Sequence, residues 1–266
     1  MAINLLAGTC RAVYHAISGL PSWEAGRVLS RGAGGDSTKV IDRVAEDAAV
    51  AYLQSQGFRG TLLSEELGVR RFGDSQYPTV ILDPVDGTTN AVRGIEFYSI
   101  SLAASMGPRL SDVSAGLVME LPTARIYQAE RGKGSAVNGE RILMPAPPRL
   151  SEGLIGVDLN VRGDRRKLEE IVPLVLGSKH VRNMGSAALE LCLVASGGLD
   201  LYFDNRGLLR VTDIAAAYLV LREAGGAVLD LGGNPLDCSL DISSRISLLA
   251  GGEKICAEAL TLLRRK

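Results

Sequence analysis

The residues best suited to chemistry in this chain are two aspartates that directly follow an apolar segment. Residues 80–82 are typical of a buried strand, and they lead into the string Asp83-Pro-Val-Asp86-Gly-Thr-Thr-Asn90. Pro84 fixes its own φ and has no N–H, so the chain turns sharply and both carboxylates can face the same point. The amides that follow can bind an anion if a helix or turn begins there. Carboxylates beside free amides suit a divalent cation together with a phosphate group, although Asp-Pro and Asp-Gly alone are ordinary turn signals.

Three further acidic residues strengthen this interpretation. Glu65 and Glu66 follow a short apolar strand pattern, and Asp213 stands at the start of an apolar helix pattern. Alone, the glutamates read as a solvated strand end and Asp213 as a helix cap or dipole partner. If Glu65 and Asp213 converge with the two aspartates, each neighbouring pair of carboxylates repels by about 4 kcal/mol at ~4 Å. Two divalent cations would cancel four negative charges, so the pattern predicts a metal centre.

The elements that position these residues divide the chain into two halves. Periodicity and breaker residues predict a helix over 4–30, interrupted at 19–21, and a second helix over 40–56. Short strands and a hairpin follow at 61–64, 79–82, 98–106, 113–120, 125–129 and 131–142. Three prolines at 145–148 then mark the boundary that we predict between residues 1–145 and residues 146–266.

The second half alternates strands with helices. Strands are predicted at 154–158, 199–203, 227–229 and 246–249. Helices are predicted at 165–176, 186–196, 213–224 and from 253 onward. The first half is therefore of the α+β class, with a large antiparallel sheet, and the second half is of the α/β class.

Composition argues against several other kinds of protein. The 266 residues contain 29 Lys and Arg against 30 Asp and Glu, so no basic excess indicates a nucleic-acid partner. No apolar segment approaches the ~20 residues needed to cross a bilayer, so no membrane partner and no signal peptide are expected. The four cysteines have no zinc-like spacing, which favours reduced thiols in the cytoplasm. His15 and His180 lie in no recognisable nucleophile motif, which disfavours a Ser-His or Cys-His hydrolase.

Taken together, these strings resemble the inositol monophosphatase family, within the lithium-sensitive, magnesium-dependent phosphatases. The resemblance covers nearly the whole chain and rests on the Asp42 helix, Ser64-Glu-Glu66, Asp83 to Asn90, Gly132-Lys-Gly134 with Asn138-Gly139, Gly185-Ser-Ala187 and Asp213-Ile-Ala-Ala216. The string from Asp204 to Asp213 is similar to the archaeal branch, where inositol monophosphatase and fructose-1,6-bisphosphatase activities commonly occur in one enzyme. Thr212 stands where many members have tryptophan, which weakens the case for strict inositol phosphate specificity.

The resemblance implies a five-layered α/β/α/β/α sandwich that binds two or three Mg²⁺ ions, with Mn²⁺ as a substitute. The implied ligands of the first ion are Glu65, Asp83 and the Val85 carbonyl. The second ion is implied to share Asp83 and to be completed by Asp86 and Asp213. Asp36, in a Gly-rich loop, is either a ligand of a weaker third ion or part of a turn.

The resemblance also implies the groups that handle the phosphate and the attacking water. The amides of Gly87 and Thr88 are implied to bind the phosphate. Thr88, coupled to Asp42, is implied to orient and deprotonate the water, with Glu65 assisting. Read without the family, Asp42 is an ordinary acid on an amphipathic helix.

Substrate recognition is implied in the second half. Gly185 and Ser186 open a helix near the substrate hydroxyls, beside Asp86, and Asp204 is a candidate hydroxyl acceptor. Arg206 and Arg210 either engage a second phosphate through bidentate guanidinium contacts or form salt bridges at a subunit interface. The family also implies a homodimer.

The leading hypothesis is therefore a phosphomonoesterase that hydrolyses inositol 1-phosphate, fructose 1,6-bisphosphate or both by direct attack of a metal-activated water. The substrate class is a small sugar or polyol phosphate. An alternative is a phosphatase for 3′-phosphoadenosine phosphates or NADP, although only 5% aromatic residues offers few surfaces for stacking a base. A third hypothesis is a metal- or phosphate-binding module without turnover.

Overall fold

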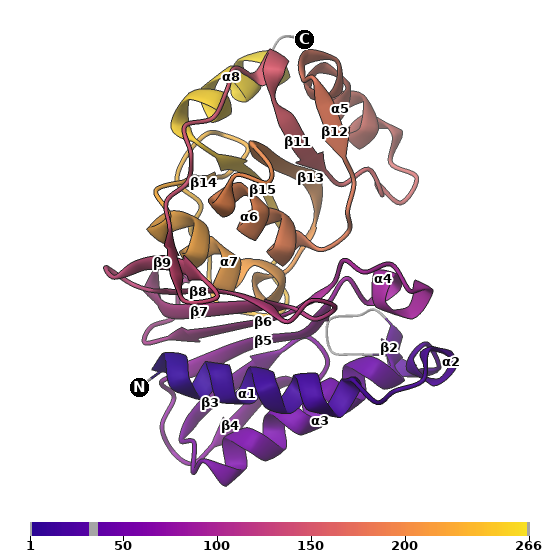
Figure 1. Ribbon diagram of the computed structural model, residues 1–266, viewed down its shortest axis with the longest axis vertical. Coiled ribbons are helices and arrows are strands. Elements are labelled where there is room, and N and C mark those ends of the chain that lie inside the picture. The colour runs from indigo at the N-terminus through magenta and orange to yellow at the C-terminus, as the bar shows by residue number, and fades with distance from the viewer. Residues whose placement is uncertain (1, 32–36, 265–266) are drawn as a thin grey trace.

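The computed structural model describes residues 2–31 and 37–264 and has five layers, helix–sheet–helix–sheet–helix (Figure 1). The first-half helices are α1 Ala2–Ile17, α2 Ser22–Ala25, α3 Val40–Ser55 and α4 Thr88–Arg93. The first-half strands are β1 Val28–Arg31, β2 Ser37–Lys39, β3 Gly60–Ser64, β4 Gly68–Phe72, β5 Thr79–Asp86, β6 Ser99–Ser105, β7 Val113–Glu120, β8 Arg125–Glu130, β9 Gly134–Val137 and β10 Glu140–Ile142. The five-layered prediction is confirmed.

The remaining elements form the second sheet and its helices. The helices are α5 Arg165–Gly177, α6 Ala187–Ser196, α7 Val211–Glu223 and α8 Glu253–Leu263, and short 3₁₀ turns occur at Leu110–Asp112 and Leu150–Glu152. The strands are β11 Leu154–Val157, β12 His180–Arg182, β13 Leu201–Leu209, β14 Ala227–Leu229 and β15 Ile246–Gly251. Strand β11 pairs in parallel with β12 and β13, while β15 pairs antiparallel with β13 and β14. A parallel group extended by an antiparallel pair agrees with the α/β pattern predicted here.

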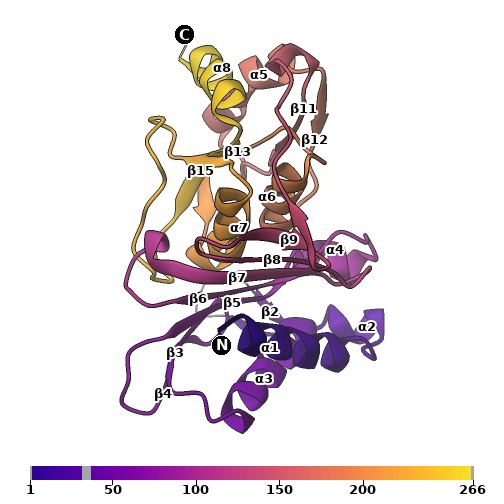
Figure 2. The same ribbon diagram turned by 60° about the vertical axis from the view of Figure 1, so that its left-hand side comes forward.

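The first sheet carries the acidic string on a central strand. Its order is β10-β9-β8-β7-β6-β5-β3-β4, and β5 pairs in parallel with β3 and antiparallel with β6. All eight residues of β5 are buried, because α1 and α3 cover one face of the sheet and α6 and α7 cover the other (Figure 2). The end of β5 therefore lies in the interior, between the first sheet and the middle helices.

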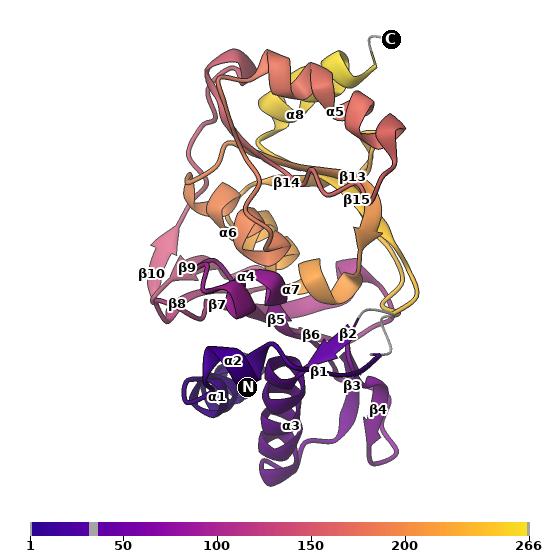
Figure 3. The ribbon, with the colours of Figure 1, turned by 90° about the vertical axis from the view of Figure 1, so that its right-hand side faces the viewer.

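The middle helix layer belongs to both sheets. One apolar cluster joins Ile81 and Ala103 of the first sheet to Ile214 of α7 and Leu248 of the second sheet. Figure 3 shows α5 and α8 on the outer face of the second sheet, with α6 and α7 between the two sheets. The halves therefore share a core, and the boundary at residue 145 stays a prediction.

Several parts of the secondary structure differ from the prediction. Strand β2 lies partly in the predicted Gly-rich loop, and β13 continues to Leu209, beyond the predicted end at residue 203. The helix predicted to residue 30 ends earlier, because Pro21 and Gly26 interrupt it and Val28–Arg31 pairs with β2 as a strand. Strand β4 was not predicted, since it is an edge strand that pairs only with β3 among the described strands. The three-residue strand β12 was also missed, and its pairing with β11 is visible only in the folded chain.

The sequence also predicted no membrane-spanning segment and reduced cysteines. Within residues 2–31 and 37–264, no helix combines the length and apolar character that crossing a bilayer requires. All four cysteines are free, and Cys10, Cys192 and Cys256 are buried.

Candidate metal and phosphate site

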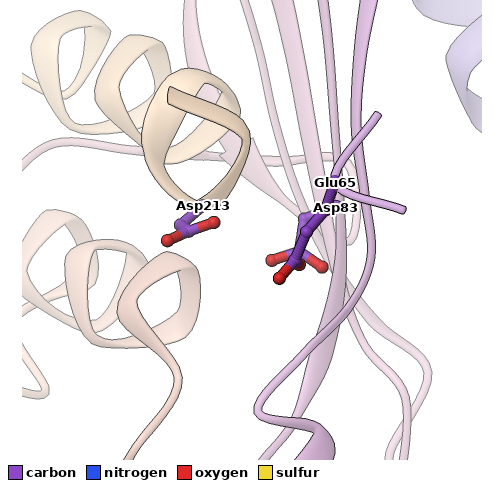
Figure 4. A group of neighbouring side chains, drawn as sticks. All are labelled: Glu65, Asp83 and Asp213. Atoms are coloured by element: carbon purple, nitrogen blue, oxygen red, sulfur yellow. The ribbon is translucent and has the colours of Figure 1, made fainter. Parts of the chain in front are cut away.

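Three carboxylates from distant parts of the chain meet at one point. One oxygen each of Glu65, Asp83 and Asp213 lies within 4.8 Å of the other two. Figure 4 shows Asp213, at the start of α7, turned towards Glu65 and Asp83. Strand ends of the first sheet and a helix start of the second half thus build one acidic centre, as the sequence predicted for these three residues.

A β-bulge orients the acids of β5. Asp83 is opposite Ser101 of β6 and Asp86 is opposite Ser99, so three steps along β5 match two steps along β6. In a regular strand, residues three apart point to opposite faces, but one extra residue restores them to the same face. The turn expected at Pro84 therefore takes the form of a bulge, and both aspartates face the middle helices.

Asp213 is placed by the first turn of α7. Its Oδ2 accepts the N–H of Arg210 at 2.9 Å, and its Oδ1 accepts the Thr212 hydroxyl at 3.1 Å. Arg210 is the N-cap residue, so Asp213 occupies the third helical position and is not itself the cap. These two bonds fix the direction of the carboxylate towards Glu65.

Asp86 lies beside the three-carboxylate group and faces the same cavity. Its Oδ2 accepts the Ser186 hydroxyl at 2.5 Å and the Ala188 N–H at 2.8 Å, both at the start of α6. Asp86 therefore joins the first half to the second at the site. Ser186, predicted as a substrate contact, is fully buried and serves to hold Asp86.

The electrostatics of the centre favour bound cations. Burial, followed by repulsion from Asp213, raises the pKa of Glu65 to about 8. Burial likewise raises the pKa of Asp86 to about 7, and burial together with the charge of Glu65 raises the pKa of Asp83 well above its usual value. Such acids are costly to ionise without a counter-charge. Hard carboxylate oxygens are the donors that Mg²⁺ and Mn²⁺ prefer, so the residues present fit a divalent cation.

Two arginines, Arg206 and Arg210, also line the cavity. Arg210 Nη1 lies 2.8 Å from Glu65 Oε1. Arg206 Nη1 lies 2.8 Å from Asp158 Oδ2, and Arg206 Nη2 lies 2.5 Å from Asp204 Oδ2. Both arginines thus make ion pairs within the chain.

Asp204 has a different position from the one expected of a hydroxyl acceptor. It is fully buried, both of its oxygens accept N–H groups of Arg206, and it does not line the cavity. The structure gives Asp204 the role of holding the Arg206 guanidinium.

The acids and arginines surround a cavity of about 360 Å³. Of the site residues predicted from the sequence, those that line this cavity are Asp42, Glu65, Asp83, Val85, Asp86, Gly87, Thr88, Gly185, Arg206, Arg210 and Asp213. Asp36 lies outside the described residues. Arg210 contacts the acidic centre through Glu65 and Arg206 lies beside Asp158, so the cavity wall carries charges of both signs.

Thr88 and Asp42 form a pair at the cavity wall. Thr88 Oγ1 lies 3.1 Å from Asp42 Oδ1 and 2.9 Å from the Val85 carbonyl oxygen, so its proton has two alternative acceptors. Asp42 is the third residue of α3, and its Oδ2 accepts the Lys39 N–H at 2.9 Å. Gly87, with φ 90°, begins α4 and leaves this part of the wall free of a side chain. The predicted coupling of Thr88 to Asp42 is therefore present as a hydrogen bond.

Among the residues that sequence reasoning did not assign to the site are Asp158, Arg162 and Asn90. Arg162 and Asp158 line the cavity, and Asp158 follows β11 as an acid at a strand end, which was an available signal. Arg162 lies in an irregular segment with φ 50°, for which no spacing pattern exists. Asn90 donates to the carbonyls of Phe97 and Met184 at 2.8 and 2.7 Å and so fixes the turn before Gly185.

Comparison with known proteins identifies the family. The sequence pattern of the inositol monophosphatase family matches residues 10–264. The chain is 39% identical over 251 residues to the fructose-1,6-bisphosphatase/inositol-1-monophosphatase of Methanothermobacter thermautotrophicus, covering 90% of this chain and 88% of that protein. It is 32% identical over 282 residues to the bifunctional NADP phosphatase/NAD kinase of Methanococcus maripaludis, covering 96% of this chain and 47% of that protein.

A solved structure gives the same result. The crystal structure of an inositol monophosphatase-fructose 1,6-bisphosphatase has a TM-score of 0.83 with this fold at 29% identity, covering 98% of this chain and 99% of that one. The family pattern extends over nearly the whole chain, and Glu65, Asp83 and Asp213, each from a different motif, meet at the acidic centre. The chain therefore belongs to the inositol monophosphatase family, whose members are metal-dependent phosphatases.

Proposed function

We propose that this chain is a Mg²⁺-dependent phosphomonoesterase acting on inositol 1-phosphate, fructose 1,6-bisphosphate or both. The observation that carries the proposal is the convergence of Glu65, Asp83 and Asp213 in a cavity that Arg206 and Arg210 also line. Two or three ions, held by these acids with Asp86 and the Val85 carbonyl, agree with the number of carboxylates. Asp36 remains a candidate ligand of the third ion.

The chemistry divides between the bound cations and the chain's own groups. When bound, divalent cations lower the pKa of water and offset the negative charge of the phosphate. Thr88 Oγ1 can accept a proton from the attacking water while donating its own to Asp42. Burial raises the pKa of Asp42 to about 6, so this carboxylate is ionised at neutral pH but basic enough to receive that proton. Glu65 assists, and the amides of Gly87 and Thr88 bind the phosphate.

Arg206 and Arg210 in the cavity wall favour a substrate with a second anionic group. Arg206 is held by Asp158 and Asp204, so its planar guanidinium is presented to the cavity in one orientation. Arg210 pairs with Glu65 and lines the same space. Gly185 leaves room for the hydroxyl-bearing ring. We therefore assign Arg206, with Arg210 beside it, to a second phosphate.

The alternative substrate is NADP. Its support is the similarity to the archaeal NADP phosphatase/NAD kinase, of which this chain spans 47%. Phosphate release from NADP, and competition of adenine nucleotides against a sugar phosphate, distinguish the two substrate classes.

Phosphate release from inositol 1-phosphate, fructose 1,6-bisphosphate and NADP, measured with Mg²⁺ and with EDTA, tests the proposal. Asp213→Asn should abolish the Mg²⁺-dependent activity, whereas Asp74→Asn, which removes an exposed acid, should preserve it. Failure on both sugar phosphates would refute the proposed function. A wild-type rate no higher than that of Asp213→Asn would instead identify a non-catalytic binding module.

A substitution of Arg206 tests whether this residue binds a second phosphate of the substrate. Arg206→Lys keeps a positive charge beside Asp158 and Asp204 but removes the planar bidentate donor. The KM for fructose 1,6-bisphosphate should rise more than the KM for inositol 1-phosphate. An equal change for both substrates would contradict the assignment of Arg206.

Two further expectations, inhibition by lithium and a homodimer, rest on family membership, and a third, a cytoplasmic location, rests on the cysteine pattern. Lithium inhibition is measurable in the same phosphate-release assay, and the oligomeric state by light scattering after size-exclusion chromatography.

A further inference from the structure

Helix α3 carries a second buried acid that the proposed chemistry does not use. Glu46 lies one helical turn after Asp42 and is fully buried. Its Oε1 accepts the hydroxyl of Ser64 and the N–H of Leu67, the latter at 2.9 Å. Its Oε2 has no hydrogen-bond partner among the described residues. A buried carboxylate is costly, so its two bonds must contribute something that an apolar side chain would not.

The two bonds of Glu46 lie on either side of a metal-binding acid. Ser64 is the last residue of β3, and Leu67 directly precedes β4. Glu65 and Glu66 form the turn between them. A single oxygen of Glu46 thus fixes the residue before Glu65 and the second residue after it.

Strand pairing also holds this turn, since Ser64 is opposite Gly68 of β4 and Leu82 of β5. The N–H of Glu65 donates to the Leu82 carbonyl of β5 at a long 3.3 Å. The Glu66 carboxylate accepts the hydroxyl of Thr38. The Glu65 side chain forms an ion pair with Arg210, which lies in the other half of the chain. Strand pairing fixes the backbone at the ends of the turn, and Glu46 adds the contacts that tie this turn to α3.

Helix α3 holds two parts of the site with one face. Asp42 bonds to Thr88 after β5, and Glu46 bonds to the turn after β3. Because a helix is rigid over one turn, the distance between these two anchoring points is fixed. We propose that Glu46 is a positioning residue that fixes the turn bearing Glu65 and thereby sets the affinity of the site for divalent cations. This inference rests on the proposed metal-dependent function.

Calorimetric titration of the metal-free protein with Mg²⁺ tests the proposal directly. Glu46→Leu should weaken Mg²⁺ binding about 10- to 100-fold, the range found when residues that orient metal ligands are removed. Glu46→Gln keeps the accepting oxygen and should bind Mg²⁺ as the wild type does. Asp47→Leu, at an exposed acid on the same helix, should also leave the affinity unchanged.

Unfolding by urea in EDTA separates positioning from a merely structural role. A structural role predicts that Glu46→Leu lowers the unfolding midpoint and leaves the Mg²⁺ affinity of the folded protein unchanged, which would overturn the proposal. A Gln variant as weak as the Leu variant would overturn it too, because the accepting oxygen would then not matter. If Glu46→Leu does not fold, Ser64→Ala removes one of the two bonds and should weaken Mg²⁺ binding about two- to tenfold.

The same titration separates this proposal from the proposed function. Wild-type protein that binds Mg²⁺ without hydrolysing either sugar phosphate refutes the function and leaves the effect of Glu46 measurable. Wild-type protein that binds no Mg²⁺ overturns both. Hydrolysis together with an unaltered Mg²⁺ affinity in folded Glu46→Leu and in Ser64→Ala overturns the role of Glu46 alone.

Discussion

Replacing Asp83 by asparagine should stabilise the metal-free protein while abolishing its response to Mg²⁺. Asp83 shares a centre with Glu65 and Asp213, with oxygens within 4.8 Å of one another. At that separation and an effective dielectric constant near 20, each ionised pair would repel by about 3.5 kcal/mol. The acids avoid much of this repulsion by retaining protons. The loss of stability is then the smaller free energy needed to keep a carboxyl group protonated at the pH of the experiment.

That cost can be bounded. Burial and the charge of Glu65 raise the pKa of Asp83 above the value of 3.8 that it has when exposed. A raised folded-state pKa gives a contribution to stability that is complete below pH 3.8 and is lost as the pH rises towards the folded-state pKa. Keeping the proton therefore costs at most about 4 kcal/mol at pH 7 and about 2 kcal/mol at pH 5. Asparagine removes this cost and keeps the oxygen that accepts the Val85 N–H.

The assay is urea unfolding at pH 5 and pH 7, in EDTA and in excess Mg²⁺. In EDTA, the free energy of unfolding of Asp83→Asn should exceed that of the wild type, and by more at pH 7 than at pH 5. With Mg²⁺ at about 100 times its dissociation constant, the wild type should gain about 2.7 kcal/mol and the variant far less. An Asp83→Asn protein that is destabilised equally at both pH values would show that the carboxylates do not repel one another, and the electrostatic argument would fail.

Three other substitutions have expected outcomes. Thr88→Ala should lower kcat about 10²- to 10⁴-fold, because the proton can no longer pass to Asp42, while calorimetry shows an unchanged Mg²⁺ affinity. Gly87→Ala should lower the free energy of unfolding by about 1–2 kcal/mol in urea, since φ is +90° and the new methyl group would lie 3.2 Å from the Gly185 carbonyl oxygen. Burial raises the pKa of Glu190 from 4.5 to about 8, so wild-type stability should fall as the pH rises through this range. Glu190→Gln should reduce that fall in unfolding experiments across pH 5–8.5, and an identical pH dependence would contradict the assignment.

Local patterns in the sequence predicted most of the regular elements. Residues 113–120 were predicted as a strand with the bounds that β7 has, because apolar residues and turn signals define both of its ends. The helix with Asp42 was likewise predicted to within one residue, from a periodic apolar face and Gly57 after it. Strand β1 was missed because its four residues become a strand only by pairing with β2.

The site was predictable where its residues follow strand ends or begin helices. Glu65, Asp83 and Asp213 carried that signal, and the string after β5 added specificity. The ion pair of Arg210 with Glu65 and the tie of Asn90 to Met184 join segments far apart in the chain, so no local pattern reports them. Asp204 and Ser186 are fully buried and do not line the cavity, because their side chains bind Arg206 and Asp86, contacts that no local pattern reports.

The origin of Asp213 has a consequence for biosynthesis. The first-half acids leave the ribosome well before α7 is made, and Asp86 gains its partners only when α6 docks. A nascent polypeptide therefore cannot assemble the cation-binding centre until the two sheets have closed on the middle helices. A half-made chain would therefore hold Glu65 and Asp83 without Asp213, and the proposed cation site would be complete only in the finished fold.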